Sequence, residues 1–140
     1  MKAPSAQAAG YSGTPLPAKI GLKAGMRLYT ANAPSPLGSL LAGAPAVVMQ
    51  ARLAPFDCAL AFAVSREQLE PLFAKLEPKL ATVGMIWIGW PKKASGLARD
   101  LTEDVVRRVG LALGLVDVKV CAIDATWSGL KFVRRLKDRR

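Results

Sequence analysis

Residues 83–96 read VGMIWIGWPKKASG, and the rest of the fold can be derived from this stretch. Its first part is apolar and too short to span a membrane, which indicates a strand buried on both faces. The pair Trp90-Pro91 ends the strand, and two lysines and a Ser-Gly pair follow. Asp100 and Thr102 are then candidate N-caps of a helix. The sequence therefore predicts a strand, a basic loop and a helix N-terminus, in that order.

The junction between this strand and this helix is the predicted ligand site. In open α/β sheets, ligands bind beyond the carboxyl ends of the strands, where free backbone N–H groups and the positive end of a helix dipole face the loop. Lys92 and Lys93 could bind an anion there, and the alternative is that both are simply solvated. Trp90 and Trp127 could stack on a base or ring, and the alternative is that both pack in the core.

Other residues are predicted to border the same crevice. Asn32 and Arg66 follow two other predicted strands and should lie at the same edge of the sheet. Ser65 and Asp100 have sufficient structural roles as N-caps. No catalytic residue is assigned. The predicted ligand-binding set consists of Trp90, Lys92, Lys93, Ser95, Gly96, Thr102, Asn32, Arg66 and Trp127.

The composition limits the chemistry that the chain can perform. There is no histidine among its 140 residues. The commonest general base, the commonest metal ligand and any Ser-His or Cys-His pair are therefore missing. Cys58 and Cys121 fall in predicted strands, where buried free thiols are expected. Because two isolated cysteines cannot form a four-ligand zinc site, we expect no metal.

We expect a flexible leader at residues 1–10, a single domain at 11–136 and a basic tail at 137–140. The leader lacks the apolar stretch of a signal peptide, and no apolar run is long enough to cross a membrane, so a cytoplasmic protein is expected. The net charge is +10. Residues 129–140 hold six basic side chains and one acidic side chain, so they carry five of these positive charges.

Alternating apolar runs and capping signals predict an α/β protein. Helices are expected at 15–20, near 37–41, after Ser65 and over 100–113. Arg107 and Arg108 lie off the apolar stripe of the last helix and are expected in solvent. Strands are expected at 26–32, 46–50, 58–64, 83–90, 116–123 and 130–135. This pattern predicts a three-layer Rossmann-like fold with a mainly parallel six-stranded sheet and an antiparallel C-terminal hairpin. The predicted strand order is 2-1-3-4-6-5, with only the last-placed pairing antiparallel.

Four blocks of the sequence resemble a family of small bacterial proteins known only as a domain of unknown function. The blocks are YSGTPL at 11–16, WPKKASG at 90–96, DLTEDVV at 100–106 and TWSGLKFV at 126–133. They occur in the same order and span roughly residues 10–135. The resemblance implies no known activity.

The expected architecture also resembles a shortened class I methyltransferase. In those enzymes a Gly-rich turn follows the first strand, and an acid that holds the ribose of S-adenosylmethionine follows the second. Here the corresponding stretches, 30–38 and 48–52, contain Asn-Ala-Pro in place of Gly-x-Gly, and no Asp or Glu. From these missing motifs we expect no cofactor and no binding of S-adenosylmethionine.

Three function classes remain open. The first is a non-catalytic interaction or regulatory module whose basic loop binds an anionic small molecule or an acidic protein surface. The second is an enzyme with a divergent nucleotide or cofactor site within residues 90–102. The third is a basic protein that binds nucleic acid weakly and nonspecifically, chiefly through its tail. No membrane partner is expected. The missing histidine and cofactor motifs favour the first class.

Overall fold

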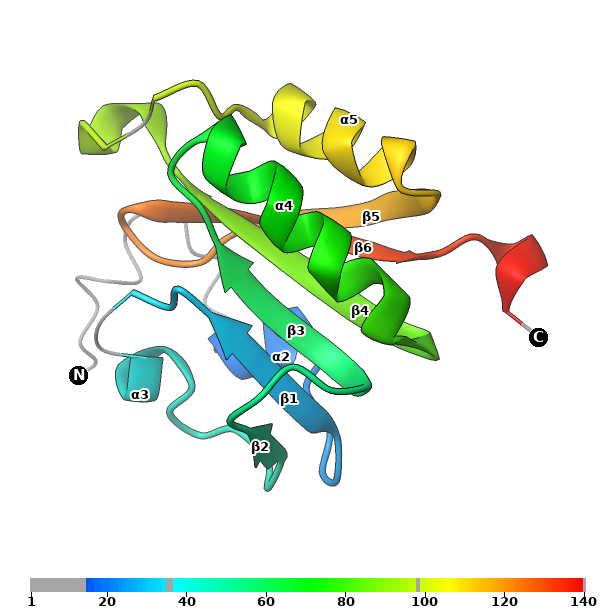
Figure 1. The fold of residues 1–140 in the computed structure, drawn as a ribbon. Helices are drawn as coiled ribbons and strands as arrows, with labels where there is room; N and C mark the ends of the chain where they lie inside the picture. The colour runs from blue at the N-terminus through cyan, green and yellow to red at the C-terminus, as the bar shows by residue number, and fades with distance from the viewer. Residues whose placement is uncertain (1–14, 35–36, 98, 140) are drawn as a thin grey trace.

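The computed structural model of the chain describes residues 15–34, 37–97 and 99–139. In these residues six strands form one sheet with helices on both faces (Figure 1). The strands are β1 (Arg27–Ala31), β2 (Val48–Gln50), β3 (Phe56–Phe62), β4 (Leu80–Pro91), β5 (Leu115–Ala122) and β6 (Trp127–Arg134). The helices are α2 (Leu16–Ile20), α3 (Leu37–Leu40), α4 (Arg66–Leu76) and α5 (Glu103–Ala112), with short 3-10 turns η1 (Glu77–Lys79), η2 (Lys93–Ser95) and η3 (Leu136–Asp138). The predicted three-layer α/β fold is confirmed.

The strands lie in the order β2-β1-β3-β4-β6-β5, as the sequence predicts. The first four strands in this order pair in parallel. Strand β6 is antiparallel to both β4 and β5, so the expectation of a single antiparallel pairing is wrong. The reason is that the short β5–β6 connection reverses the chain, and β6 then enters the sheet between β4 and β5. Strand β5 consequently has the same direction as β4.

One face of the sheet is covered by α4 and α5 (Figure 1). Phe73 of α4 and Phe132 of β6 meet edge to face under these helices, with ring centroids 5.0 Å apart. Gly110 allows α5 to approach closely, because a Cβ at this position would lie 2.2 Å from the Phe132 ring. The close contact fixes α5, and with it the start of this helix, relative to the sheet.

The opposite face is covered by α2. The indole Nε1 of Trp87 in β4 donates a hydrogen bond to the carbonyl of Ile20 over 3.0 Å. The ammonium group of Lys119 in β5 donates to the carbonyl of Lys19 over 3.1 Å. Gly21 ends the helix in the left-handed conformation, with φ 91°. These bonds satisfy carbonyl groups at the C-terminus of α2 and attach this helix to the sheet.

Of the N-caps predicted for the two longer helices, Ser65 and Thr102 are confirmed and Asp100 is not. Ser65 caps α4, and its hydroxyl accepts from the amide of Gln68. Thr102 caps α5, and its hydroxyl accepts from the amide of Val105. Asp100 does not begin a helix. Its Oδ1 instead accepts from the backbone amide of Arg66, so this carboxylate serves the N-terminus of α4.

Some expectations concern residues that the structure does not describe. Residues 1–10, the predicted leader, and the first four residues of the YSGTPL block are among them. Within the described residues, no helix has the length and apolar character that crossing a bilayer requires. Both thiols are free; Cys58 is buried, as expected, and Cys121 is half-buried.

Candidate functional site: a basic pocket at the end of strand β4

A surface pocket with a volume of about 580 Å³ opens beside the carboxyl end of β4. We call it the basic pocket. Trp90 of β4 and Ser128 of β6 are register partners in the sheet, so their side chains lie on the same face. The lining residues are Trp90, Pro91, Lys92, Lys93, Arg99, Leu101, Thr102, Glu103 and Ser128. The predicted junction of strand, basic loop and helix start therefore forms a hollow in the folded chain.

The loop after β4 is shaped by local hydrogen bonds. The amide of Lys92 donates to the carbonyl of Thr126 over 2.7 Å, which keeps the loop beside the β5–β6 hairpin. The hydroxyl of Ser95 donates to the carbonyl of Lys92 and accepts from the amide of Leu97. Gly96 follows in the left-handed conformation, with φ 81°. Ser95 and Gly96 thus shape the loop and do not line the pocket.

The rim of the pocket carries positive charge from three side chains, Lys92, Lys93 and Arg99. Across residues 15–34, 37–97 and 99–139, no carboxylate forms an ion pair with Lys93 or Arg99. The first N–H groups of α5 add to this potential, because they have no intrahelical acceptors and lie at the positive end of the helix dipole. The pocket therefore has the electrostatics of an anion site.

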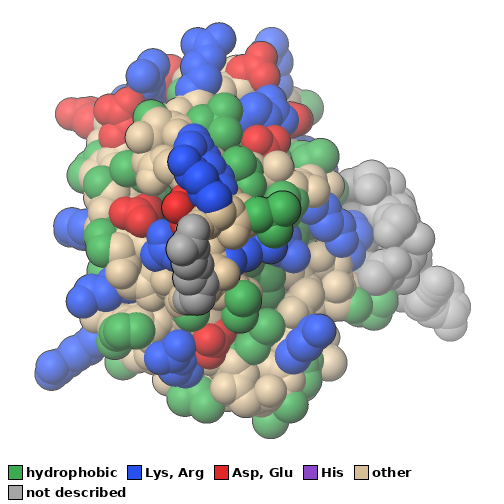
Figure 2. Space-filling view, turned by 90° about the vertical axis from the view of Figure 1, so that its right-hand side faces the viewer, with side chains coloured by type: hydrophobic (Ala, Val, Ile, Leu, Met, Phe, Trp, Pro, Cys, Tyr) green, Lys and Arg blue, Asp and Glu red, His purple; other side chains and the backbone are tan. Residues whose placement is uncertain are grey.

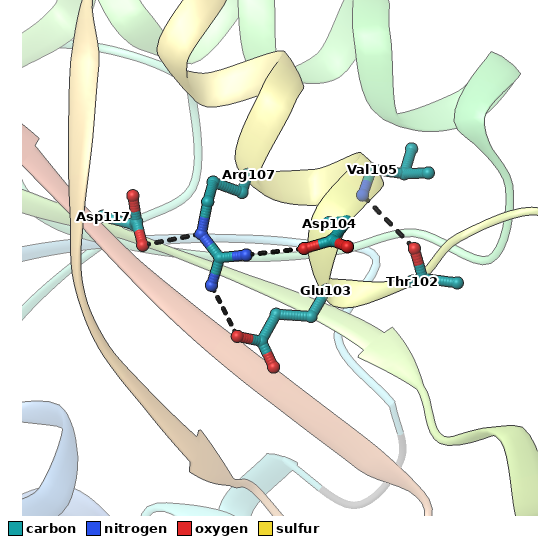
Figure 3. Close-up of polar contacts among 6 residues, drawn as sticks. All are labelled: Thr102, Glu103, Asp104, Val105, Arg107 and Asp117. Atoms are coloured by element: carbon teal, nitrogen blue, oxygen red, sulfur yellow. Dashed lines mark hydrogen bonds and ion pairs between the residues drawn. The ribbon is translucent and has the colours of Figure 1, made fainter.

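The acidic residues near the start of α5 are bound by one arginine (Figure 3). Arg107 pairs with Asp117 of β5 at 2.9 Å, with Asp104 at 2.9 Å and with Glu103 at 2.5 Å. The hydrogen bonds that Arg107 donates, first to Asp117 and then to Glu103, raise the pKa of its guanidinium group. The expectation that Arg107 lies in solvent is wrong, because Asp117 on the neighbouring strand binds it.

Three of the predicted site residues lie elsewhere. Arg66 pairs with Glu70 and lines a separate hollow of about 410 Å³ between α4 and α5. Trp127 packs edge to face on Phe62, with centroids 5.4 Å apart, in the core on the α2 face. Asn32 follows β1, and its amide donates to the carbonyl of Phe62 over 3.2 Å. Of the predicted set, the basic pocket brings together Trp90, Lys92, Lys93 and Thr102.

Two polar lining residues, Arg99 and Ser128, are not in the predicted set. Arg99 directly precedes Asp100 in the sequence, and its charge beside the lysine pair could have indicated it. Ser128 enters the pocket through the register of β6 against β4, which the sequence does not reveal. Trp90 is only 6% exposed, so most of its ring packs in the core.

The thiols are poor candidates for nucleophiles. Burial raises the pKa of Cys58 to about 12, despite the opposing effect of nearby Lys131. Burial also raises the pKa of Cys121. A low thiolate fraction makes both groups weakly reactive at neutral pH. In the described parts of the chain, no group of three or more metal-binding side chains is found.

Comparison with solved structures identifies the fold class. The ribosomal protein L11 methylase from Lactobacillus delbrueckii subsp. bulgaricus superposes with a TM-score of 0.59 and 12% identity over 86% of this chain and 76% of that chain. A TehB-like SAM-dependent methyltransferase from Corynebacterium glutamicum gives a TM-score of 0.57 and 14% identity over 91% of both chains. The chain has a methyltransferase-like Rossmann fold. No family model matches the sequence, and no curated protein matches it.

This finding corrects the expectation on the cofactor. A further neighbour with the same fold, the 1,6-didemethyltoxoflavin-N1-methyltransferase from Burkholderia thailandensis, was crystallised with S-adenosylhomocysteine. It shares 14% identity over 85% of this chain and 74% of that chain, with a TM-score of 0.58. The expectation that S-adenosylmethionine does not bind is therefore wrong. Asn32, in the stretch that corresponds to the Gly-rich turn, adopts the left-handed conformation, φ 55°, that glycine ordinarily provides.

Proposed function

We propose that the chain is a ligand-binding module on a methyltransferase-like scaffold and that the basic pocket binds a small molecule carrying a phosphate or carboxylate group. The proposal is supported mainly by one observation: the side chains of Lys93 and Arg99 and the N-terminus of α5 all lie at the same hollow. The hollow lies at the carboxyl edge of the parallel strands, where open α/β sheets bind ligands. Trp90, Pro91 and Leu101 supply an apolar wall beside the charges.

The C-terminal basic residues offer a weaker alternative site. Arg134 is held by Glu77 Oε2 at 3.0 Å and by the carbonyls of Glu77 and Leu80, so its guanidinium group serves the fold. The face shown in Figure 2 carries basic side chains that are scattered among acidic and hydrophobic ones. A nucleic-acid backbone requires a continuous basic surface. These observations favour the pocket over the tail as the anion site.

The proposal is tested by titrating the protein with inorganic phosphate and following tryptophan fluorescence. The variant Lys93→Ala/Arg99→Ala should bind roughly tenfold more weakly, because it removes from the rim two cations that pair with no carboxylate of the described residues. Its free energy of unfolding should change by less than about 0.5 kcal/mol, since both side chains are exposed. The matched control, Lys75→Ala/Lys79→Ala, removes two exposed lysines near the opposite end of β4 and should bind as wild type does. Equal affinity of both variants would contradict the proposal.

A second candidate function is the binding of S-adenosylmethionine at the carboxyl ends of β1 and β2. The observation that favours it is Gln50, which ends β2 where methyltransferases carry the ribose-binding acid. Its Nε2 donates to the carbonyl of Pro55, whereas its buried Oε1 finds no donor among the described residues. An acceptor without a donor fits a ligand hydroxyl, because leaving a buried acceptor unsatisfied costs free energy.

Calorimetric titration with S-adenosylmethionine tests this second candidate. Gln50→Glu should strengthen binding, since a carboxylate accepts a stronger hydrogen bond from a hydroxyl. Gln50→Leu should weaken binding, and Lys93→Ala/Arg99→Ala should leave it unchanged because the two sites are separate. Affinities that do not respond to either change at Gln50 would contradict the assignment.

A further inference from the structure

Glu103 is the one acidic side chain among the described residues that line the basic pocket. It is the first residue of α5, and its side chain is 46% exposed. Thr102 already caps the helix by accepting from the amide of Val105, so the carboxylate of Glu103 has no capping role. A mobile carboxylate at this position would be an internal competitor for any anion that enters the pocket.

In the structure, this carboxylate is bound by Arg107, one turn further along α5. Arg107 is anchored independently, because Asp117 of β5 binds its Nε and Asp104 binds its Nη1, each at 2.9 Å (Figure 3). The Arg107 side chain is 29% exposed, and its guanidinium group binds Asp117 on β5. Glu103 is therefore attracted toward the edge of the sheet, and no carboxylate of the described residues pairs with Lys93 or Arg99.

We infer that Arg107 is a positioning residue: it keeps the basic pocket open to external anions by holding Glu103 away from Lys93 and Arg99. The inference rests on the proposed function of the pocket. A tethered group has an effective concentration on the order of millimolar or more, so a released carboxylate would compete with weakly bound phosphate. Arg107 then affects phosphate binding through Glu103 and has no contact with the ligand.

Phosphate titrations of three variants test the inference. Arg107→Met should weaken binding roughly threefold to tenfold, because Glu103 becomes an internal competitor. The double variant Arg107→Met/Glu103→Gln should regain wild-type affinity within about twofold, since an amide does not neutralise the cations. Glu103→Gln alone removes a negative charge from the pocket lining and should strengthen binding by no more than about twofold, because Arg107 already binds the carboxylate. This last variant keeps all residues of the Asp117–Arg107–Asp104 network and should fold normally.

A merely structural role of Arg107 gives a different result. In that case Arg107→Met would weaken binding equally with and without Glu103, and the inference would be wrong. Unchanged binding in Arg107→Met, or a large gain in Glu103→Gln alone, would also overturn it. If Arg107→Met does not fold, Arg107→Lys replaces it, because a compact ammonium group lacks the planar fork of donors with which Arg107 binds the three carboxylates.

A measurement without ligand separates this inference from the proposed function. The side-chain Cε–Hε resonances of Lys92 and Lys93 should shift in Arg107→Met and return in Arg107→Met/Glu103→Gln, as Glu103 reaches the lysines only in the former. If these shifts occur while wild-type protein does not bind phosphate, the proposed function fails and the positioning role of Arg107 stands. If the shifts are absent, the positioning role fails, whatever the pocket binds.

Discussion

The backbone amide of Arg66, at the start of α4, donates a 2.8 Å hydrogen bond to Oδ1 of Asp100, which is 34 residues away in the loop before α5. This bond links the N-termini of the two helices on one face of the sheet. It also fixes the loop that carries Arg99 and Leu101 into the basic pocket.

Asp100→Ala should therefore destabilise the protein. Removing a carboxylate that satisfies a first-turn amide costs about 1 kcal/mol at a helix N-terminus. Chemical denaturation measures this loss. The matched control is Asp100→Asn, which keeps an acceptor oxygen and should lose clearly less. Similar losses in both variants would show that the charge of Asp100, and not the hydrogen bond, is what matters.

The ion pair of Arg27 with Asp57 should make stability fall at low pH. Hydrogen bonds from Arg27 lower the pKa of Asp57 from its ordinary value of 3.8. The unfolded chain therefore takes up this proton at a higher pH than the folded protein does. The stabilisation is complete above pH 3.8 and is lost as the pH falls through the folded pKa.

Because both side chains are partly exposed, solvent screening limits the effect to about 1 kcal/mol or less. Denaturation curves of wild type and Asp57→Asn should differ at pH 6 and converge toward pH 2. A difference that persists unchanged at pH 2 would contradict this assignment.

Gly110→Ala should destabilise the protein, although alanine is the better helix former. The gain in helix propensity is about 1 kcal/mol. Against it, the new methyl group would lie 2.2 Å from the ring of Phe132, which is fully buried and packs on Phe73. Overpacking of this kind typically costs 1–3 kcal/mol, so a net loss of up to about 2 kcal/mol is expected in chemical denaturation. Adding Phe132→Leu should recover part of the loss by making room for the methyl group.

Arg134 and the C-terminal residues 137–140 should differ strongly in their effect on stability. Arg134 donates hydrogen bonds to the carbonyls of Glu77 and Leu80. Arg134→Ala removes this donor and should lower the free energy of unfolding by about 1–3 kcal/mol. Deleting residues 137–140 removes little packing, since 137–139 are exposed, and should change the free energy of unfolding by less than about 1 kcal/mol. Thermal unfolding compares the two, and a larger loss in the deletion would contradict the assigned role of Arg134.

The strand order could be predicted because each element carries its own local signal. The buried run before Pro91, the capping residues Ser65 and Thr102, and the short turn before Trp127 fix the type and direction of the elements. Handedness rules for parallel connections then leave few topologies. The sequence does not determine the first residue of α5, because Asp100 and Thr102 are both good N-caps. The structure shows that Asp100 instead accepts a hydrogen bond from the first backbone amide of α4.

The site was predicted in part for the same reason. Lys92 and Lys93 follow β4 directly, so the end of one strand places them. Trp127 and Asn32 also lie near strand ends, but Trp127 packs on the α2 face of the sheet, and Asn32 donates to the carbonyl of Phe62, the last residue of β3. Arg107 was expected in solvent, and this expectation was wrong because its partner Asp117 lies on β5, the strand that follows the helix. Such contacts depend on register, which the sequence pattern does not specify.

The most direct test of the central claim is a phosphate titration of ¹⁵N-labelled protein followed residue by residue in amide spectra. We expect the largest shift changes at Lys92–Ser95, at the first amides of α5 and at Ser128, and we expect them to vanish in Lys93→Ala/Arg99→Ala. Changes that centre instead on Arg134–Arg139 and persist in that variant would show that the anion site is the C-terminal segment and that the basic pocket has no such role.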